Sequence, residues 1–354
     1  MSIVAQRSKD RTIGRVAELD VVGLGYCCLD ELLLLSEIPE PEGRALIRQR
    51  GEQGGGMVAT AMVAAAKLGA RVGFIGAVGG DETGRVIASE FRAYGVDVSR
   101  LVVRPGFTSH RTVVLVDERT GARSFLSDRG TAGPVQAVEL DRAYVTSAKL
   151  LHLSDASEAA LTAARWMKEC GGEVCFDGTH FHPALWPLIP LVDYLIVSRF
   201  FTSEFAAHTA GKDAGRAAAL FAGVEGGGAH PASAHPAPDL VTPLAGEQLL
   251  AVARQLREHG PCVVVVTEGE DGSWCASDEE DFHVPAVPVP AEQMVDTTGA
   301  GDVFHGAFLY GRSQGWDLRR SLSLGAATAA LKCHALGGRA GIPTLEEALA
   351  LVAE

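Results

Sequence analysis

The stretch Val295-Asp-Thr-Thr-Gly-Ala-Gly-Asp302-Val-Phe-His-Gly-Ala-Phe308 is the most informative part of the sequence. A Thr- and Gly-rich turn leads directly into a helix that we expect to begin near Ala300. Glycines leave backbone N–H groups uncovered, and a helix N-terminus directs several of them toward one point. Such a turn is suited to a phosphoryl group that carries developing charge. Asp302 is then either a base that takes a proton from an attacking hydroxyl, or an ordinary acid that offsets the helix dipole.

Upstream of this turn, short apolar runs alternate with helical stretches. Helices are predicted over Met57–Leu68 and Asp81–Tyr94, each followed by a glycine. The runs that predict buried strands are Leu19–Gly25, Val72–Gly76, Leu150–Leu153, Val174–Phe176, Tyr194–Val197 and Val263–Thr267. This alternation predicts an α/β fold with a doubly wound, mostly parallel sheet and helices on both of its faces.

Two segments break the alternation. Thr112–Asp117 and Ala122–Ser127 flank a short turn and predict a β-hairpin, and Arg44–Arg50 alternates apolar and basic residues as a half-exposed strand does. We expect these segments to form a small antiparallel lid, from about 33–52 and 108–130.

The lid is predicted to belong to one domain over residues 19–354, after an N-terminal tail over residues 1–18. Residues 223–243 are rich in Gly, Ala, His and Pro and have almost no large apolar side chain. A packed element cannot form from that composition, so a flexible insertion is predicted there.

The composition limits the classes of partner and compartment. The formal net charge of −13 argues against nucleic acid or an anionic membrane as the main partner. No apolar run reaches the ~18–20 residues that a membrane span needs, and residues 1–17 lack the apolar block of a signal peptide. The seven cysteines do not resemble a disulfide framework, so we expect reduced thiols and a cytoplasmic protein.

Two cysteines and two histidines raise the question of a zinc site. Cys170 and Cys175 precede His180 and His182, but this spacing is not that of a standard zinc finger. We therefore interpret them as buried thiols and loop histidines.

The sequence resembles the ribokinase (phosphofructokinase B) family of sugar kinases. Asp296-Thr-Thr-Gly-Ala-Gly-Asp302 is similar to the C-terminal signature of this family, and Gly55-Gly56, Ala59-Thr60-Ala61 and Gly76–Gly84 are similar to its N-terminal signature. The resemblance implies a ribokinase-like fold that transfers the γ-phosphoryl group of ATP to a sugar hydroxyl. It also implies a homodimer, because lid strands in this family commonly pair between subunits.

The family pattern assigns roles to individual residues. Asp302 would be the catalytic base, and the anion hole would comprise Gly299, Ala300 and Gly301. Residues implied to bind the sugar are Asp30, Gly55, Gly56 and Thr60. Residues implied to line the nucleotide are Thr267, Gly269, Gly272, Thr298, Gly325 and Ala329. Mg²⁺ would accompany ATP, and a site for K⁺ would comprise Asp296, Thr298, Ala335, Gly337 and Gly341.

The sequence departs from the family pattern where magnesium is organised. The usual Asn-x-x-Glu is replaced by Ser198-Arg-Phe-Phe201, and Glu204 is near but out of register. Asp177, at the end of a predicted strand, either helps to hold the metal and phosphates or caps a turn.

The substrate is less well defined. Gly338–Pro343 and Gly54–Ala61 are similar to the branch that contains sulfofructose kinases, in which Arg44 would meet an anionic end of the sugar. Arg44 is otherwise a solvated strand residue, and Asp155 offers a carboxylate that suits hydroxyls. A neutral sugar and an anionic sugar, such as 6-sulfofructose or a sugar phosphate, therefore both remain open.

Two other classes of protein are alternatives to a sugar kinase. A nicotinamide-binding fingerprint that starts at Gly23-x-Gly25 fails because its third glycine position is Cys28, and the Gly-Lys-Ser/Thr of a P-loop is absent. A non-catalytic sugar or nucleotide sensor is favoured by the missing Asn-x-x-Glu. The intact turn with Asp302 argues against a sensor, because a pure binder has no need of the base.

Overall fold

The computed structural model describes residues 18–120, 122–211 and 244–352. Its main sheet has eight strands in the order β14-β13-β12-β11-β10-β9-β1-β4. Neighbours are parallel except at β12–β13 and β13–β14. The strands are β1 (Leu19–Leu24), β4 (Val72–Ile75), β9 (Ala148–Leu153), β10 (Glu173–Gly178), β11 (Tyr194–Ser198), β12 (Val263–Thr267), β13 (Ser273–Ser277) and β14 (Asp281–Val284). The predicted mostly parallel sheet is confirmed.

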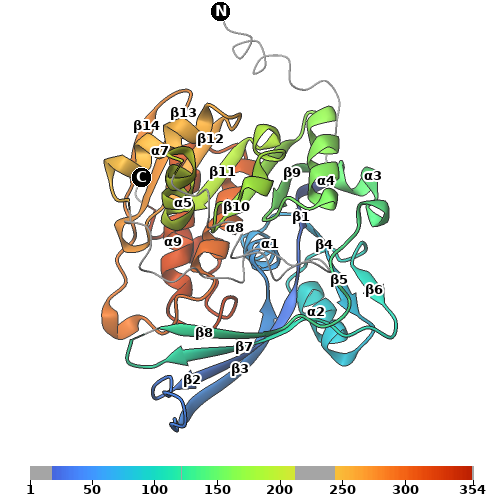
Figure 1. Ribbon diagram of the computed structural model, residues 1–354, viewed down its shortest axis with the longest axis vertical. Helices are drawn as coiled ribbons and strands as arrows, with labels where there is room; N and C mark the ends of the chain where they lie inside the picture. The colour runs from blue at the N-terminus through green and yellow to red at the C-terminus, as the bar shows by residue number, and fades with distance from the viewer. Residues whose placement is uncertain (1–17, 121, 212–243, 353–354) are drawn as a thin grey trace, which may run out of the picture.

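Helices cover both faces of this sheet (Figure 1). One face packs on α1 (Met57–Lys67), α8 (Ala300–Ser313) and α9 (Leu318–Lys332), and the other on α4 (Glu158–Glu169), α5 (Arg199–Thr209) and α7 (Glu247–Arg257). Successive strand residues alternate between the two cores: Val21 joins the first and Val22 the second. Strands apolar on both sides are what a buried parallel sheet requires.

A second, four-stranded sheet projects from the main one, in the order β3-β2-β7-β8 (Figure 1). We call it the lid sheet: β2 (Cys28–Leu35), β3 (Ile47–Gly55), β7 (Arg111–Asp117) and β8 (Arg123–Asp128). The hairpin of β7 and β8 was predicted, but two features were not. The strand expected at Arg44–Arg50 runs instead from Ile47 to Gly55, and the central pair β2–β7 is parallel, so the lid is not wholly antiparallel.

Both differences have a physical reason. Pro39, Pro41 and a left-handed Glu42 (φ 65°) keep the segment before β3 irregular. The chain passes through α1 and α2 (Glu82–Ala93) between β2 and β7, and such a crossover allows parallel pairing where a tight turn does not. The shorter elements are β5 (Ala77–Gly79), β6 (Val102–Arg104), α3 (Arg142–Val145) and α10 (Leu345–Leu349).

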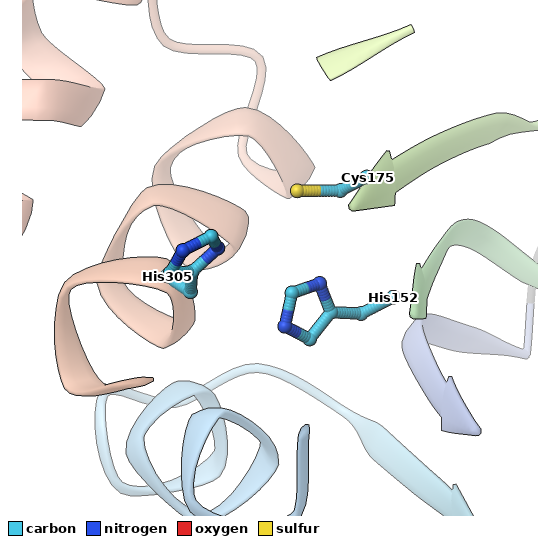
Figure 2. Close-up of side chains that lie close together, drawn as sticks. All are labelled: His152, Cys175 and His305. Carbon is cyan, nitrogen blue, oxygen red and sulfur yellow. The ribbon is translucent and has the colours of Figure 1, made fainter. Parts of the chain in front are cut away.

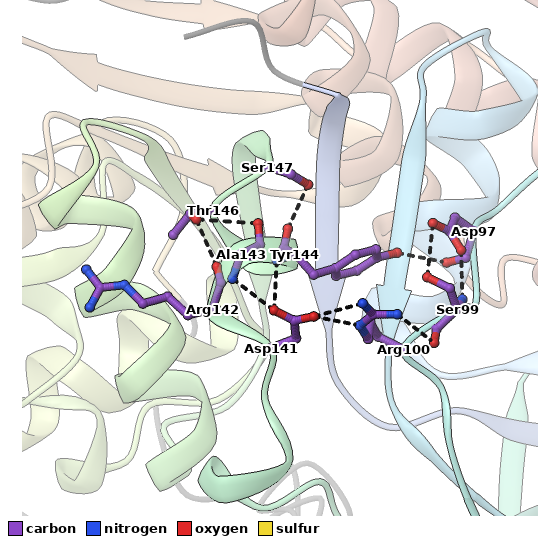
Figure 3. A network of polar contacts seen from close by, with 9 residues as sticks. All are labelled: Asp97, Ser99, Arg100, Asp141, Arg142, Ala143, Tyr144, Thr146 and Ser147. Carbon is purple, nitrogen blue, oxygen red and sulfur yellow. Dashed lines mark hydrogen bonds and ion pairs between the residues drawn. The ribbon is translucent and has the colours of Figure 1, made fainter.

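A polar network fixes the start of β9 against the neighbouring loop (Figure 3). The Asp141 carboxylate caps α3 by accepting hydrogen bonds from the amides of Ala143 (2.9 Å) and Tyr144 (3.3 Å), and it also accepts one from Arg100 Nε (2.9 Å). The Tyr144 hydroxyl donates to the carbonyl of Asp97 (3.3 Å). The entry to β9, a strand that reaches the candidate site, is therefore held by side chains as well as by the sheet.

Among the described residues, none of the helices is both long and apolar enough to cross a membrane. The predicted insertion, residues 223–243, and all but the last residue of the predicted tail, residues 1–18, lie outside the described residues.

Candidate functional site

The first turn of α8 has the geometry predicted for the anion-binding turn. Its N-cap, Gly299, has φ 72°, and a Cβ there would lie 2.8 Å from Cα of Gly338, so the close approach of two backbones requires glycine. The amide of Ala300 donates to the carbonyl of Thr297 (3.2 Å) and is already engaged. The next two amides, of Gly301 and Asp302, have no acceptor within the helix, and nothing lies within 4 Å of a Cβ placed at Gly301.

Asp302 lies among charged side chains from several elements. Burial raises the pKa of its carboxyl well above the ordinary value, and the negative charges of Asp177 and Asp30 raise it further. The positive charges of Arg339 and Lys332 act in the opposite direction. Carboxylates of β10 and of the lid strand β2 are therefore near enough to Asp302 of α8 to act on its charge. An isolated acid that only offset a helix dipole would not have such neighbours.

Asp30 faces the predicted sugar site from the lid sheet. Burial raises the pKa of Asp30, and a hydrogen bond from Cys28 Sγ to Oδ1 (3.1 Å) partly offsets that rise. A Cβ at Gly55 would lie 2.1 Å from Asp30 Oδ2, so glycine leaves room for the carboxylate. Gly56 caps α1 with φ 102°, where a Cβ would lie 2.6 Å from the carbonyl of Tyr26. The structure thus brings together three of the residues predicted to bind sugar.

Arg339 is a residue of this site that sequence reasoning missed. Its side chain is fully buried, with Nη1 3.2 Å from Glu90 Oε2. Nη2 donates to the carbonyl of Gly55 (3.2 Å) and Nε to Thr60 Oγ1 (3.4 Å). Thr60, predicted to contact sugar, therefore also holds Arg339. The sequence Gly338-Arg-Ala-Gly341 gives no sign of burial, because only the tertiary packing against α1 and α2 shows it.

Asp296 joins the Gly-rich turn at the start of α8 to the loop after α9. Its Oδ1 accepts hydrogen bonds from the amide (2.8 Å) and hydroxyl (2.7 Å) of Thr298, and its Oδ2 accepts one from the amide of Gly337 (2.8 Å). The buried Lys332 Nζ donates to the carbonyl of Asp296 (2.6 Å). A Cβ at Gly341 would lie 2.3 Å from the carbonyl of Lys332.

Of the five residues predicted to hold K⁺, the structure therefore gathers Asp296, Thr298 and Gly337 directly. Ala335 and Gly341 lie in the same loop, beside the end of α9. The lysine ammonium already provides a positive charge at this place.

The predicted nucleotide-binding residues lie on two elements. Thr267 ends β12, and its hydroxyl donates to the carbonyl of Val197 (3.3 Å). Gly269 and Gly272 bound the turn that follows, with φ 65° and 91°. Gly325 lies against α8, where a Cβ would meet the Phe304 ring at 2.8 Å, so helix packing by itself accounts for this glycine. Ala329 is half-buried one turn further along α9.

Of the residues considered for magnesium, Ser198 and Glu204 are engaged in other hydrogen bonds, and Asp177 is a buried carboxyl. Ser198 caps α5 by accepting hydrogen bonds from the amides of Phe200 (3.1 Å) and Phe201 (3.3 Å). Glu204 is engaged elsewhere, with Oε1 2.9 Å from His180 Nδ1 and Oε2 accepting from the amide of Phe181 (2.8 Å). Asp177 is buried at the end of β10, and burial raises its pKa to about 7. Of these three, Asp177 is the residue whose charge acts on Asp302.

Three other expectations concern single residues. Arg44 is exposed and precedes β3, whose first residue pairs with Leu35 of β2. Asp30 lies five residues before Leu35 on β2, so the start of β3 is about 17 Å from Asp30 at the usual rise per residue of a strand. Asp155 follows β9 and accepts a hydrogen bond from the amide of Ser157 (2.8 Å). His182 Nδ1 accepts from the amide of Ala184 (3.1 Å), so His180 and His182 have other partners than Cys175.

A strand-edge site with a helix N-terminus, converging carboxylates and a covering lid defines a phosphoryl-transfer enzyme of the doubly wound α/β class. The family model "pfkB family carbohydrate kinase" matches residues 19–228 and 239–345. The chain is also 31% identical over 350 residues to a 5-dehydro-2-deoxygluconokinase of Shouchella clausii, covering 95% of this chain and 96% of the relative. An aminoimidazole riboside kinase of Salmonella typhimurium is 31% identical over 307 residues, covering 82% and 84%.

Solved structures agree on the fold. Arabidopsis thaliana ribokinase complexed with ribose and ATP gives a TM-score of 0.75 at 21% identity, covering 95% of this chain and 99% of its own. Xylella fastidiosa fructokinase with bound ATP gives 0.71 at 22% identity, covering 95% and 98%. The chain belongs to the pfkB family of carbohydrate kinases. It is an ATP-dependent sugar kinase, a phosphotransferase with an alcohol group as acceptor.

Proposed function

We propose that Asp302 is the general base of this kinase and that the first turn of α8 binds the transferred phosphoryl group. The observation that carries the proposal is the convergence of Asp302, Asp30 and Asp177 at the one helix N-terminus that the motif predicted. The raised pKa makes Asp302 a stronger base than a solvated carboxylate, once it is ionised. The amides of Gly301 and Asp302 face the position where charge develops, and Gly299 allows the turn to form.

The acceptor hydroxyl is held from the lid side. Asp30 accepts hydrogen bonds from sugar hydroxyls, and Gly55 and Gly56 allow the sugar to approach the backbone. Lid closure over the sugar excludes water, so that the hydroxyl rather than water attacks the phosphoryl group. Asp302 takes the hydroxyl proton as the new O–P bond forms and the bond to the ADP oxygen breaks. The loop from Thr267 to Gly272, together with Gly325 and Ala329 of α9, would face the nucleotide.

The magnesium ion that accompanies ATP fits this site only in part. A structural relative from E. coli is described in complex with ATP and Mg²⁺. Asp177 is the buried carboxylate of this chain that could interact with the ion or its water ligands, because Glu204 is engaged by His180 and Phe181. When bound, Mg²⁺ neutralises charge on the phosphates. We place no K⁺ in the mechanism, since the ammonium of Lys332 already lies beside Asp296.

The proposed substrate is a small sugar or sugar derivative, and an anionic sugar is the second candidate. The first candidate follows from Asp30, whose carboxylate suits neutral hydroxyls. The second is favoured by the relatives named 5-dehydro-2-deoxygluconokinase, whose name implies a sugar acid, and by the guanidinium of Arg339 behind Gly55. Arg44 and Asp155 stay predictions of sugar contacts, and the sulfofructose branch is one member of the anionic class.

The test is ATP-dependent ADP release across a sugar panel with Mg²⁺ present. The panel contains fructose, ribose, 2-keto-3-deoxygluconate, 5-dehydro-2-deoxygluconate, fructose 6-phosphate and 6-sulfofructose. Asp302→Asn should lower kcat by roughly 10²–10⁴-fold with an unchanged fold, the range expected for a general base. Unchanged kcat in this variant would overturn the proposed mechanism. Turnover confined to the anionic sugars would select the second candidate, and Arg44→Ala would then show whether Arg44 contributes to KM.

A further inference from the structure

Three side chains that the kinase mechanism does not use lie together behind α8: His152, Cys175 and His305 (Figure 2). His152 and Cys175 are fully buried, and His305 is 4% exposed. One ligand atom from each lies within 4.8 Å of the others. We call these three residues the His-Cys-His cluster. It is the only such group of three or more potential ligands among the described residues.

The fold itself brings the cluster together. Cys175 of β10 is the register partner of His152 of β9, and side chains of paired residues in adjacent strands point to the same face. That face is covered by α8, which contributes His305 from the opposite side of the cluster (Figure 2). His305 comes three residues after Asp302, so the cluster lies within one helical turn of the proposed base.

The polar atoms of the cluster lack the partners that burial demands. Nδ1 of His305 has no hydrogen-bond partner among the described residues, and the ring of His152 has at most a weak one, the backbone of Cys175. Buried polar atoms in native proteins are nearly always paired, so this shortage of partners around one thiol needs an explanation. The other nitrogen of His305, Nε2, lies 3.3 Å from Asp177 Oδ1. A histidine held by a carboxylate through one nitrogen, with the other nitrogen unpartnered, is the arrangement usual for metal-ligating histidines.

The donor set selects the kind of ion. Imidazole nitrogen and thiolate sulfur bind zinc and its neighbours in the first transition row, whereas Mg²⁺ and Ca²⁺ prefer oxygen. Bond lengths of about 2.0–2.3 Å to a shared ion place tetrahedral ligand atoms about 3.3–3.8 Å apart. Ring rotations of the two histidines, which would bring their atoms closer by about an ångström, are therefore enough to meet that geometry.

We propose that His152, Cys175 and His305 form a binding site for a zinc-like divalent ion, with Asp177 as the residue that orients His305. Binding exchanges the thiol proton of Cys175 for the metal: the S–H bond breaks, an S–metal bond forms and one proton is released. The ion links β9, β10 and α8 behind the anion-binding turn. The three ligands of this site are not those of the magnesium that accompanies ATP, although Asp177 borders both, and the test of the site does not depend on kinase activity.

The experiment uses full-length protein freed of metal with a chelator, and Co²⁺ alone as the probe. Cys170 and Cys262, the two exposed cysteines of the described chain, are first replaced by Ser so that they cannot contribute. We expect one Co²⁺ per chain, a sulfur-to-cobalt charge-transfer band and the intense visible bands of tetrahedral Co²⁺, all lost on addition of Zn²⁺. Cys175→Ala should abolish the charge-transfer band.

Cys275→Ala is the matched control, because Cys275 is an equally buried thiol of the same sheet, on β13 outside the cluster. It should keep the band. A second measurement covers the case in which Cys175→Ala does not fold. Zn²⁺ should raise the Tm of the parent and of Cys275→Ala, since a ligand that binds only the folded state stabilises it. Absence of both the band and the Tm rise in the parent, or a band that survives in folded Cys175→Ala, would overturn the proposal.

Discussion

At the scale of single residues, burial and charged neighbours together set the pKa of the Asp302 carboxyl. Burial raises its pKa, Asp177 and Asp30 raise it further, and Arg339 and Lys332 lower it. A carboxyl with a raised pKa is protonated, and useless as a base, at acidic pH. We therefore expect kcat/KM to rise with pH through an acid limb set by Asp302.

Neutralising one neighbour at a time should move this limb in opposite directions. Asp177→Asn removes a negative charge and should shift the limb to lower pH, whereas Arg339→Met removes a positive charge and should shift it to higher pH. Each shift should be on the order of 1 pH unit. The measurement is kcat/KM from pH 5 to 9 on the best sugar of the panel. If the acid limb of both variants stayed at the pH of the parent enzyme, a group other than Asp302 would set it.

The same residues show what the sequence could and could not predict. Asp302 and Gly299 belong to a local motif whose spacing already implies a helix N-terminus, and Asp30 was found through the family resemblance. Arg339 and the His-Cys-His cluster depend on contacts between segments far apart in the chain. Cys175 was weighed with its sequence neighbours His180 and His182, but its partners in space come from β9 and α8. Cys175 lies beside His152 because β9 and β10 pair in parallel with these two residues in register, and the sequence does not reveal that register.

At the scale of elements, the end of α9 and the anion-binding turn are joined by Lys332. Its Nζ donates to the carbonyl of Asp296, so a lysine side chain lies where the family resemblance implies K⁺, and burial lowers the pKa of that lysine. We predict that turnover changes little when KCl is replaced by tetramethylammonium chloride at equal ionic strength. Lys332→Met should lower the free energy of unfolding by about 1–3 kcal/mol, because the carbonyl of Asp296 loses its buried partner. Strong activation of the parent enzyme by K⁺ would contradict this role of Lys332.

The strands β9, β1 and β4 are joined at their N-terminal ends by Asp20. Its carboxylate accepts hydrogen bonds from Arg71 Nε (3.2 Å) and lies 2.8 Å from Lys149 Nζ. Burial alone would raise the pKa of Asp20, but the hydrogen bonds from Arg71 and Lys149 outweigh burial and lower it. The contribution of Asp20 to stability is therefore present above the ordinary carboxyl pKa of ~3.9 and is lost as the pH falls through the lower pKa of the folded state.

Asp20→Asn should accordingly lower the free energy of unfolding at pH 7 by on the order of 1–3 kcal/mol. The difference from the parent should shrink as the pH falls below about 4. Urea unfolding at several pH values measures both. Glu169→Gln is the control, because the Arg142–Glu169 pair is 57% exposed on both sides and such pairs contribute about 0–1 kcal/mol. An equal effect of the two substitutions would mean that the Asp20 network adds nothing beyond a surface pair.

Buried strands were easier to locate from the sequence than exposed ones. The six parallel strands of the main sheet are short apolar runs because both of their faces are covered, and each was located within a few residues. The two antiparallel strands at its edge, β13 and β14, were not predicted. The lid strand β3 has exposed positions such as Ile47, at 42%, and its polar residues carry no strong period. Its start was therefore misplaced by three residues, and the parallel pairing of β2 with β7 had no local signal at all.

At the scale of the whole molecule, the lid sheet carries a concentration of exposed apolar side chains. Leu46 is 64% exposed beside β3, and Phe125 and Leu126 are 46% and 58% exposed on β8. Both β3 and β8 are edge strands of this sheet. Open edges with apolar side chains pair readily with another chain, and grouped exposed apolar residues mark interaction surfaces. These features support the predicted homodimer, with the two lids in contact.

The prediction for the assembly is that the parent protein sediments as a dimer and that the double substitution Phe125→Lys and Leu126→Lys gives a monomer. Lysines on an edge strand oppose pairing through charge, and they remove apolar area from an interface that must bury about 1,200–2,000 Å² in total to be stable. Val138→Lys is the matched control, because Val138 is 93% exposed but lies outside the lid. Sedimentation velocity over a range of protein concentrations distinguishes the two states. A parent that sediments as a monomer, or a Val138→Lys variant that dissociates equally, would show that the lid does not form the contact.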